Sequence, residues 1–324
     1  MGRRIDYLRV SVTDRCNLRC VYCMPEAGVP LVERGEILSL EEMGLLIEAA
    51  AATGVTRVRF TGGEPLLRRG LTSLIRTTAG LPGITDVALT TNGILLGDMA
   101  GELKAAGLSR VNVSLDSLRP ERFAAMTRGG DLEQVRRGIA AALAAGLEPV
   151  KINAVIVRGL NDDEVEDLAR LTVDPGLHVR FIELMPISDA ARFLPDRLVT
   201  AAEIRERLAG WGRWETADGP VGGGPARYMR LPGAAGTVGF ISALSDHFCG
   251  SCNRLRLTAN GCLRACLYHG AEWDTRGLLR AGYPRERLLA GLGAVIQEAA
   301  AAKPAGHQLE GGWTDQRSMS QLGG

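Results

Sequence analysis

The sequence has no apolar stretch long enough to cross a bilayer, although 46% of its 324 residues are hydrophobic. Its first residues also lack the apolar segment of a secretory signal peptide, because Asp6 follows soon after Arg3 and Arg4. From these two absences we expect a cytoplasmic protein that has no membrane partner.

An excess of charge of one sign is also missing. Lysine and arginine together number 38, and aspartate and glutamate 37, so the formal net charge is +1. Proteins that bind nucleic acid without sequence preference carry a basic field that this chain lacks. We therefore expect no nucleic-acid partner, and any preference for an anion must come from arginines gathered at one place.

Seven cysteines are present, but the conditions that favour disulfides are not. Disulfide frameworks are typical of small secreted domains, whereas this chain is long enough for one large α/β domain or two smaller ones. In a reducing compartment such a set of thiols indicates metal binding or catalysis.

The first cysteine set, Cys16, Cys20 and Cys23, follows a short apolar run. Its spacing would scatter the thiols around an ordinary helix, so we expect a loop wrapped around a group that sulfur holds. Three thiolates can bind three irons of a [4Fe–4S] cluster and leave the fourth iron open for a small molecule. A zinc site or a disulfide remains the alternative.

Apolar runs alternate with helix-length segments over the first part of the chain. This pattern predicts parallel strands joined by right-handed crossovers. Six such units suffice for a partial (β/α)6 TIM-like barrel that is open on one side. A flat doubly wound sheet is the alternative, disfavoured because cysteines stand where its Gly-x-Gly-x-x-Gly would be. We expect strands at 6–12, 55–60, 86–91, 110–115, 149–157 and 178–184, and helices at 39–53, 95–106, 131–145 and 162–171.

The pattern changes after about residue 190. A helix over 201–208 precedes glycine-interrupted β segments within 227–243, a hairpin that turns at Asn260-Gly261, and a helix over 288–303. We expect the partial barrel to occupy residues 1–200 and a C-terminal α+β extension with a second iron–sulfur site to occupy 201–324.

The second cysteine set is Cys249, Cys252 and Cys266. A second group of three thiols suggests a second cluster with an open iron. It could instead be a zinc site completed by Cys262, His247 or His269. We interpret Cys262 as a bystander, because a free cysteine often packs as a small apolar residue.

Two arginines, Arg254 and Arg256, lie within this second set. On a strand they share one face, with Leu255 and Leu257 on the other. Neighbouring guanidiniums repel unless an anion lies between them, and phosphate suits such a pair. A solvated strand face is the alternative.

The first cysteine loop, with Tyr22 before its last cysteine, and the sequence Gly-Gly-Glu-Pro at 62–65 resemble the radical S-adenosylmethionine enzymes. The second set with its two arginines narrows the resemblance to the GTP 3′,8-cyclase family. Ser-Val-Thr-Asp-Arg at 11–15 and the tail Met-Ser-Gln-Leu-Gly-Gly at 319–324 agree with it. The resemblance covers nearly the whole chain.

This resemblance implies two [4Fe–4S] clusters, each with three cysteine ligands, and S-adenosylmethionine. The cluster ligands would be Cys16, Cys20 and Cys23 for the first cluster, and Cys249, Cys252 and Cys266 for the second. Contacts to S-adenosylmethionine would be Tyr22, Gly63, Ser114 and Met185. Contacts to GTP would be Arg9, Arg59, Thr90, Lys151, Arg254 and Arg256. Catalytic residues would be Arg9, Arg254, Arg256, Gly323 and Gly324, the last two in a tail that enters the active site.

Without the resemblance, several of these residues have ordinary structural interpretations. Met185 and Thr90 could pack in the core, Lys151 could be a solvated charge at a strand end, and Tyr22 could be a structural aromatic. The terminal glycines could simply fray.

The activity implied by the resemblance is conversion of GTP to (8S)-3′,8-cyclo-7,8-dihydroguanosine 5′-triphosphate, the first step of molybdenum cofactor biosynthesis. The family further implies a homodimer and an electron donor such as flavodoxin or ferredoxin. One alternative is another radical S-adenosylmethionine enzyme, with an auxiliary cluster and a peptide substrate. The other is a zinc- or nucleic-acid-binding module without enzymatic activity.

Overall fold

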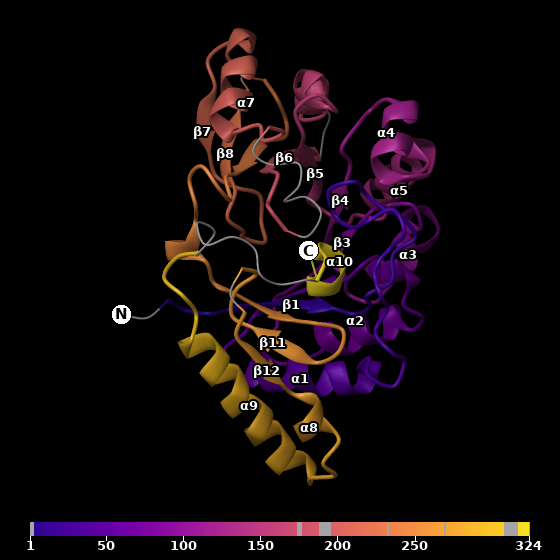
Figure 1. Ribbon diagram of the computed structural model, residues 1–324, viewed down its shortest axis with the longest axis vertical. Helices are drawn as coiled ribbons and strands as arrows, with labels where there is room; N and C mark the ends of the chain where they lie inside the picture. Colours follow the sequence, from indigo (N-terminus) through magenta and orange to yellow (C-terminus); the bar gives the residue numbers. More distant parts are fainter. Residues whose placement is uncertain are drawn as a thin grey trace.

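The computed structural model describes residues 3–173, 177–187, 196–231, 233–268, 270–307 and 317–323. Its strands belong to one 12-stranded sheet (Figure 1). None of the helices in these ranges combines the length and apolar character that a membrane span requires.

Six parallel strands form the middle of this sheet in sequence order, from β1 to β6. Sequential order is that of a β/α barrel, whereas a doubly wound sheet reverses its order part-way. The predicted partial barrel is therefore confirmed and the doubly wound alternative is wrong. The strands are β1 (Tyr7–Ser11), β2 (Arg57–Thr61), β3 (Asp86–Thr91), β4 (Arg110–Ser114), β5 (Val150–Ile156) and β6 (Leu177–Glu183). The helices between them are α1 (Leu40–Ala52), η1 (Pro65–Leu67), α2 (Leu71–Ala79), α3 (Leu96–Ala105), α4 (Pro120–Thr127), α5 (Leu132–Ala144), η2 (Asp162–Glu164) and α6 (Val165–Arg170).

The C-terminal part of the chain extends the sheet at both ends. β10 (Arg254–Leu257) pairs in parallel with β1, and β9 (Val238–Ile241) pairs in parallel with β6. Antiparallel strands follow on each side, so β12 and β7 form the two edges and the sheet is open. The remaining elements are α7 (Ala201–Leu208), η4 (Ala209–Trp211), β7 (Glu215–Ala217), β8 (Arg227–Arg230), η5 (Cys249–Ser251), β11 (Cys262–Arg264), β12 (Glu272–Asp274), α8 (Arg276–Leu279), α9 (Arg285–Ala301) and α10 (Met319–Leu322).

Local sequence signals explain where several helices begin. Ser39 and Glu42 form a capping box at the start of α1, and Thr200 and Glu203 form one at the start of α7. Asp131 caps α5 by accepting a hydrogen bond from the backbone of Glu133. These caps satisfy backbone N–H groups that the first helical turn leaves unpaired, so the helix starts agree with the predicted ones.

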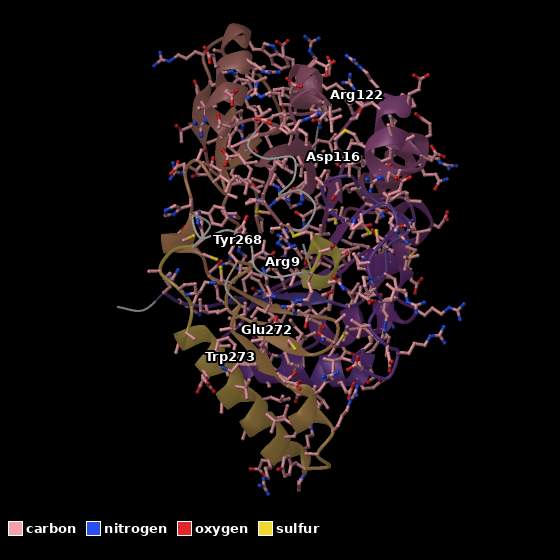
Figure 2. The ribbon with its side chains drawn as sticks, viewed as in Figure 1. Arg9, Asp116, Arg122, Tyr268, Glu272 and Trp273 are labelled. Atoms are coloured by element: carbon pink, nitrogen blue, oxygen red, sulfur yellow. The ribbon has the colours of Figure 1, made fainter. Side chains whose placement is uncertain are left out.

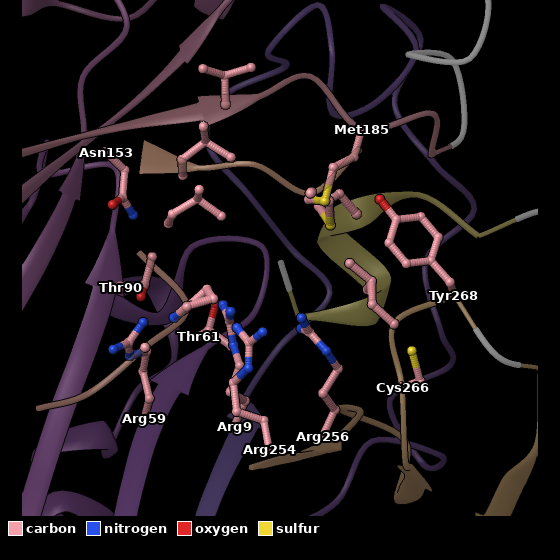
Figure 3. A pocket seen from close by; sticks show the side chains of 18 of the residues that line it. Arg9, Arg59, Thr61, Thr90, Asn153, Met185, Arg254, Arg256, Cys266 and Tyr268 are labelled. Atoms are coloured by element: carbon pink, nitrogen blue, oxygen red, sulfur yellow. The ribbon is translucent and has the colours of Figure 1, made fainter. Parts of the chain in front are cut away.

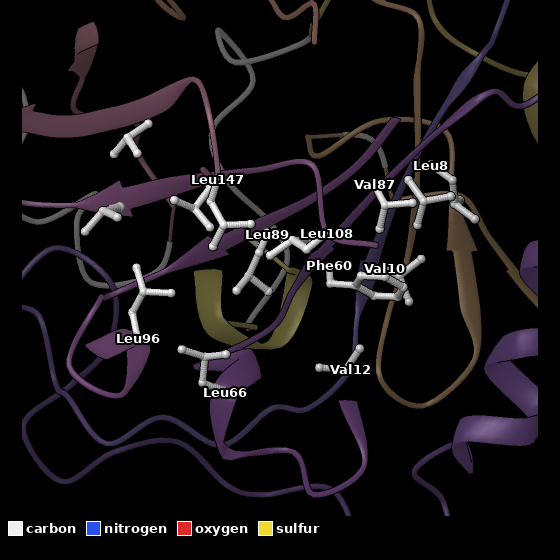
Figure 4. Packing of buried hydrophobic residues seen from close by; sticks show 14 of the residues in the cluster. Leu8, Val10, Val12, Phe60, Leu66, Val87, Leu89, Leu96, Leu108 and Leu147 are labelled. Atoms are coloured by element: carbon white, nitrogen blue, oxygen red, sulfur yellow. The ribbon is translucent and has the colours of Figure 1, made fainter. Parts of the chain in front are cut away.

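The two faces of the central strands have different surroundings. Leu8 and Val10 of β1 and Phe60 of β2 are fully buried in one apolar core against the outer helices (Figure 4). Arg9 and Arg59 occupy the alternate positions of the same strands and point to the inner side, where they line a cavity. The strand alternation therefore produces an apolar outer face and a polar inner face.

Candidate active site

Both cysteine sets line the same cavity on the inner side of the sheet. The first set comes from the loop after β1, and the second from segments around β10 and β11. Side chains of β1, β2, β3 and β10 form one wall of this cavity. Two groups of thiols far apart in the sequence thus share one space.

The half-buried thiols of the first set fit a metal group. Burial, with the neighbouring thiol of Cys23, raises the pKa of Cys20 well above its usual value. Burial also raises the pKa of Cys23 to about 12. A bound metal ion takes the place of the thiol proton, because its positive charge stabilises the thiolate that burial alone disfavours.

The arrangement of these ligands differs from that of a single-ion site. Nowhere in the described ranges do three His, Cys, Asp or Glu side chains converge as the ligands of one metal ion do. In a [4Fe–4S] cluster each thiolate binds a different iron, so its ligands surround a larger object.

The turn after β2 approaches the first cysteine loop too closely for side chains. A Cβ at Gly63 would lie 2.2 Å from the carbonyl oxygen of Arg15, and one at Gly62 would lie 2.4 Å from that of Thr13. The backbone N–H of Gly63 donates to the Thr13 carbonyl at 2.8 Å, and that of Glu64 to the Arg15 carbonyl at 2.8 Å. Glycine is therefore required where the two loops meet.

The four residues expected to contact S-adenosylmethionine, Tyr22, Gly63, Ser114 and Met185, all line the cavity. The hydroxyl of Tyr22 donates to Asp116 Oδ2 at 2.6 Å, and the backbone of Val155 donates to Asp116 Oδ1 at 2.8 Å. Burial raises the pKa of Asp116 to about 6. Asp116 therefore fixes the orientation of Tyr22, and it lies deep in the molecule (Figure 2).

The second cysteine set has a more positive environment than the first. Burial opposes ionisation of Cys252, but Arg254 and Lys303 outweigh it and lower the pKa of this thiol to about 6. The ammonium of Lys303 also donates to the carbonyl of Arg254 at 2.7 Å and to that of Ala265. Lys303 thus ties together the segments that carry this set.

The alternative zinc ligands lie in different places. Cys262 is on β11 opposite Asp274, and it is not among the residues that form the cavity wall in the described ranges. His247 lines the cavity, and its ring centroid is 4.9 Å from that of His307. His269 lies outside the described residues.

A row of arginines crosses three neighbouring strands. The parallel register places Arg9 of β1 opposite Arg59 of β2 and opposite Arg256 of β10. Arg254 joins them, and Figure 3 shows the four side chains pointing into the cavity from one wall. Burial and the neighbouring Arg256 and Arg59 lower the pKa of Arg9 well below its usual value. A buried row of like charges is unfavourable unless an anion lies against it, so this wall favours an anionic ligand.

Several polar atoms of cavity-lining residues have no hydrogen-bond partner within the described ranges. They include Nε and Nη2 of Arg59, Oγ1 of Thr90 and Oδ1 of Asn153. Buried polar atoms are normally paired, and unpaired ones facing a cavity indicate a ligand that completes them. The wall therefore offers both donors and acceptors to a polar molecule.

Lys151, another predicted GTP contact, is separated from this wall. It is fully buried, and its ammonium donates to the carbonyls of Pro220 at 3.2 Å and Val221 at 2.7 Å. Burial and the nearby Arg180 lower its pKa to about 6. The glycine-rich loop 219–225 supplies both acceptors, and Lys151 is not among the described residues that line the cavity, although Arg180, which does line it, lies nearby.

The C-terminal tail folds back into the molecule. Arg256 Nη1 donates to the carbonyl of Gly323 at 2.8 Å, and α10 lies in the middle of the molecule, in front of β1 (Figure 1). Gly323 has φ +74°, and a Cβ there would lie 3.0 Å from that of Ser11. Gly324 lies outside the described residues. The penultimate glycine therefore reaches a predicted GTP contact.

Two family models match successive parts of the chain. Residues 10–172 match the radical SAM superfamily, and residues 177–309 match molybdenum cofactor synthesis C. A GTP 3′,8-cyclase of Pelotomaculum thermopropionicum is 56% identical over 99% of this chain and 98% of the relative. A GTP 3′,8-cyclase of Heliobacterium modesticaldum is 57% identical over 100% of this chain and 98% of the relative.

This chain belongs to the GTP 3′,8-cyclase family. Membership in the radical SAM superfamily implies a [4Fe–4S] cluster and S-adenosylmethionine. Among solved structures, SuiB of Streptococcus suis bound to its precursor peptide SuiA matches with a TM-score of 0.61, at 14% identity, over 90% of this chain and 67% of that one. The same protein bound to S-adenosylmethionine matches with a TM-score of 0.56, at 13% identity, over 90% of this chain and 68% of that one. These two likenesses concern the fold alone.

Sequence reasoning missed several cavity residues of this GTP 3′,8-cyclase family member. Asn153 lies two positions beyond Lys151 on β5, and Asp116 lies two beyond Ser114 at the end of β4. Polar residues at alternate positions along a strand and just beyond its end were a signal that could have found both. Asn92, Arg180, Tyr268 and Lys303 line the cavity as well.

Proposed function

We propose that this protein converts GTP to (8S)-3′,8-cyclo-7,8-dihydroguanosine 5′-triphosphate, the first step of molybdenum cofactor biosynthesis. The full-length similarity to GTP 3′,8-cyclases supports the assignment. One structural observation carries it: two three-cysteine sets line a single cavity that a row of arginines lines as well.

The first set, Cys16, Cys20 and Cys23, would hold the cluster that binds S-adenosylmethionine. Gly63 would leave room for close approach of the methionine part, and Tyr22, Ser114 and Met185 would contact the rest. When bound, the reduced cluster and S-adenosylmethionine supply the radical chemistry that removes hydrogen from C3′ of the ribose. The hydrogen bond from Tyr22 to Asp116 keeps the tyrosine in place during that step.

The second set, Cys249, Cys252 and Cys266, would hold a second [4Fe–4S] cluster with an open iron for the guanine of GTP. The low pKa of Cys252, which Arg254 and Lys303 lower against the effect of burial, supports binding as a thiolate. Three ligands leave one iron free, as in the first set.

The arginine row would bind the triphosphate and hold the ribose between the two sets. Arg9, Arg59 and Arg256 present donors to phosphate oxygens, and Thr90 supplies a hydroxyl. Lys151 can join only after loop 219–225 releases its ammonium. Fixing the substrate in this way brings C3′ and guanine C8 into a reactive geometry, which is the main contribution of the protein itself.

The tail residues Gly323 and Gly324 would complete the site. Because Gly323 accepts from Arg256, the tail can orient that guanidinium towards substrate. The tail also lines the cavity through Met319 and Ser320, where it would help to exclude water from the radical reaction.

The remaining predictions rest on the family alone. We infer a homodimer, a flavodoxin or ferredoxin as electron donor and a cytoplasmic location. We also infer two domains, residues 1–200 and 201–324. The two matched family models meet before that boundary, since the first ends at residue 172 and the second begins at residue 177.

Anaerobic incubation of the reconstituted protein with GTP, S-adenosylmethionine and a reductant tests the activity directly. The expected products are the cyclised nucleotide, methionine and 5′-deoxyadenosine. If S-adenosylmethionine is cleaved only after a peptide is added, the peptide alternative is correct. If the protein contains zinc and no iron, both enzymatic assignments fail.

A further inference from the structure

The C-terminus of α4 lies directly against the first cysteine loop. The backbone N–H of Arg19 donates to the carbonyl of Thr127 at 3.0 Å, and that of Val21 donates to the carbonyl of Met126 at 2.9 Å. These carbonyls belong to the last turn of α4 and lack partners within the helix. The loop and the helix end therefore satisfy each other.

Arg128, the next residue along the chain, adds two contacts in the opposite direction. Its Nη1 donates to the carbonyls of Arg19 and Met24, each at 3.0 Å. Inside this span the loop closes on itself, because the N–H groups of Cys23 and Met24 both donate to the carbonyl of Cys20. Arg128 thus holds the two ends of the turn that carries Cys20 and Cys23.

The backbone of Arg128 is in a conformation that does not favour arginine. Its φ is +54°, and it is the one non-glycine residue with positive φ in the described ranges. Glycine adopts this left-handed conformation at lower cost, and Gly129 follows with φ +112°. The guanidinium is the feature that arginine adds here and glycine would not.

The contacts of this guanidinium are not those of a surface ion pair. In the part of the chain that the structure describes, they go to main-chain carbonyls of the cysteine loop rather than to a carboxylate. By contrast Arg122, on the same helix, pairs with Asp163 and Glu164. A charged donor that bridges two carbonyls fixes the distance between them.

We propose that Arg128 is a positioning residue for the first cysteine set. It holds residues 19 and 24 so that Cys20 and Cys23 face the cavity before a cluster is inserted. The inference rests on the proposed role of these cysteines as cluster ligands. It does not make Arg128 a catalytic residue, because Arg128 is not among the described residues that line the cavity.

Arg128→Gly provides the test, since it removes the guanidinium and relieves the backbone at the same time. We expect unchanged or raised thermal stability, but amide exchange of Arg19 and Val21 faster by about tenfold in the cluster-free full-length chain. After reconstitution we expect about four irons per chain rather than about eight, with GTP affinity retained. Arg128→Lys should restore part of the iron, because one ammonium can still reach a carbonyl. Arg137→Ala, an exposed arginine on α5, is the matched charge control.

Wild-type amide exchange and iron content in Arg128→Gly would overturn the proposal. So would loss of both clusters together with a lowered melting temperature, since that outcome means general destabilisation. The proposed function fails separately: if the wild-type chain takes up no iron at the first set, the cysteine assignment is wrong, whatever the exchange data show.

Discussion

At the scale of single residues, the arginine row determines what the cavity can bind. Arg9, Arg59 and Arg256 stand in register on adjacent strands and are each less than a tenth exposed. Water cannot screen their repulsion at this depth, so the protein is less stable with the site empty than a neutral wall would make it. A triphosphate relieves that repulsion, and this gain adds to its binding free energy.

The first prediction concerns Arg254 and Arg256. Replacing either with Ala should weaken GTP binding by about 10-fold to 100-fold, because each variant would lose the charge-assisted contact that we propose with the nucleotide. Titration calorimetry with GTP on the reconstituted protein measures the change. Arg76→Ala, on the exposed side of α2, removes the same charge and should leave affinity unchanged. Equal affinity in all three variants would mean that the strand arginines are structural.

A second prediction concerns Glu64, whose carboxylate accepts from Leu66, Thr91 and Asn92. Burial raises its pKa to about 7, so the folded state binds its proton more tightly than the unfolded state. Protonation of Glu64 therefore stabilises the folded state. This stabilisation is fully present below about pH 4.5 and is lost as the pH rises through about 7. Between pH 6 and pH 8 the loss should be about 1 kcal/mol.

Denaturant unfolding at these two pH values tests this prediction. Glu64→Gln should be less stable overall, because one amide oxygen replaces two acceptors, but its stability should change less with pH. Glu133→Gln, exposed on α5, should keep the wild-type slope. An unchanged slope in Glu64→Gln would show that another group titrates.

At the scale of elements, the short helix α10 connects the tail to the arginine row. Leu322 is fully buried, and its neighbour Gly323 accepts from Arg256. Removing the last two residues should therefore leave the fold and both clusters intact but abolish cyclisation, because Arg256 loses its partner. Product analysis and iron content on the same preparation decide the outcome. Turnover at the wild-type rate would mean that the tail has no catalytic role.

The same scale shows what the sequence could predict. Strands β1 to β6 carry apolar residues at alternate positions or in short runs, and α1 and α5 have clear caps, so all were found within a few residues. The helices α2 and α4 were missed. α2 is rich in threonine, which has a low helix propensity, and no side chain caps it. α4 has only eight residues and likewise lacks a side-chain cap.

At the scale of the whole molecule, the decisive contacts join distant parts of the chain. β10 adds to β1 and β9 adds to β6, so the C-terminal segment meets the barrel at both of its ends. Local periodicity carries no information about such pairing, which is why the sequence predicted two cysteine sets but could only assume that they face each other. Likewise the alternation of Arg254 and Arg256 was readable, whereas their alignment with Arg9 required the register.

This arrangement allows the two sets to be separated by substitution. Cys20→Ser should leave about four irons per chain, abolish cleavage of S-adenosylmethionine and spare GTP binding. Cys252→Ser should also leave about four irons, but it should weaken GTP binding, because the guanine would lose its iron. Iron analysis, calorimetry and product analysis on matched preparations distinguish the two. Cys262→Ser, on β11 outside the cavity wall, should retain about eight irons and full activity. If that control lost half of its iron, Cys262 would be a ligand and the division into two sets of three would be wrong.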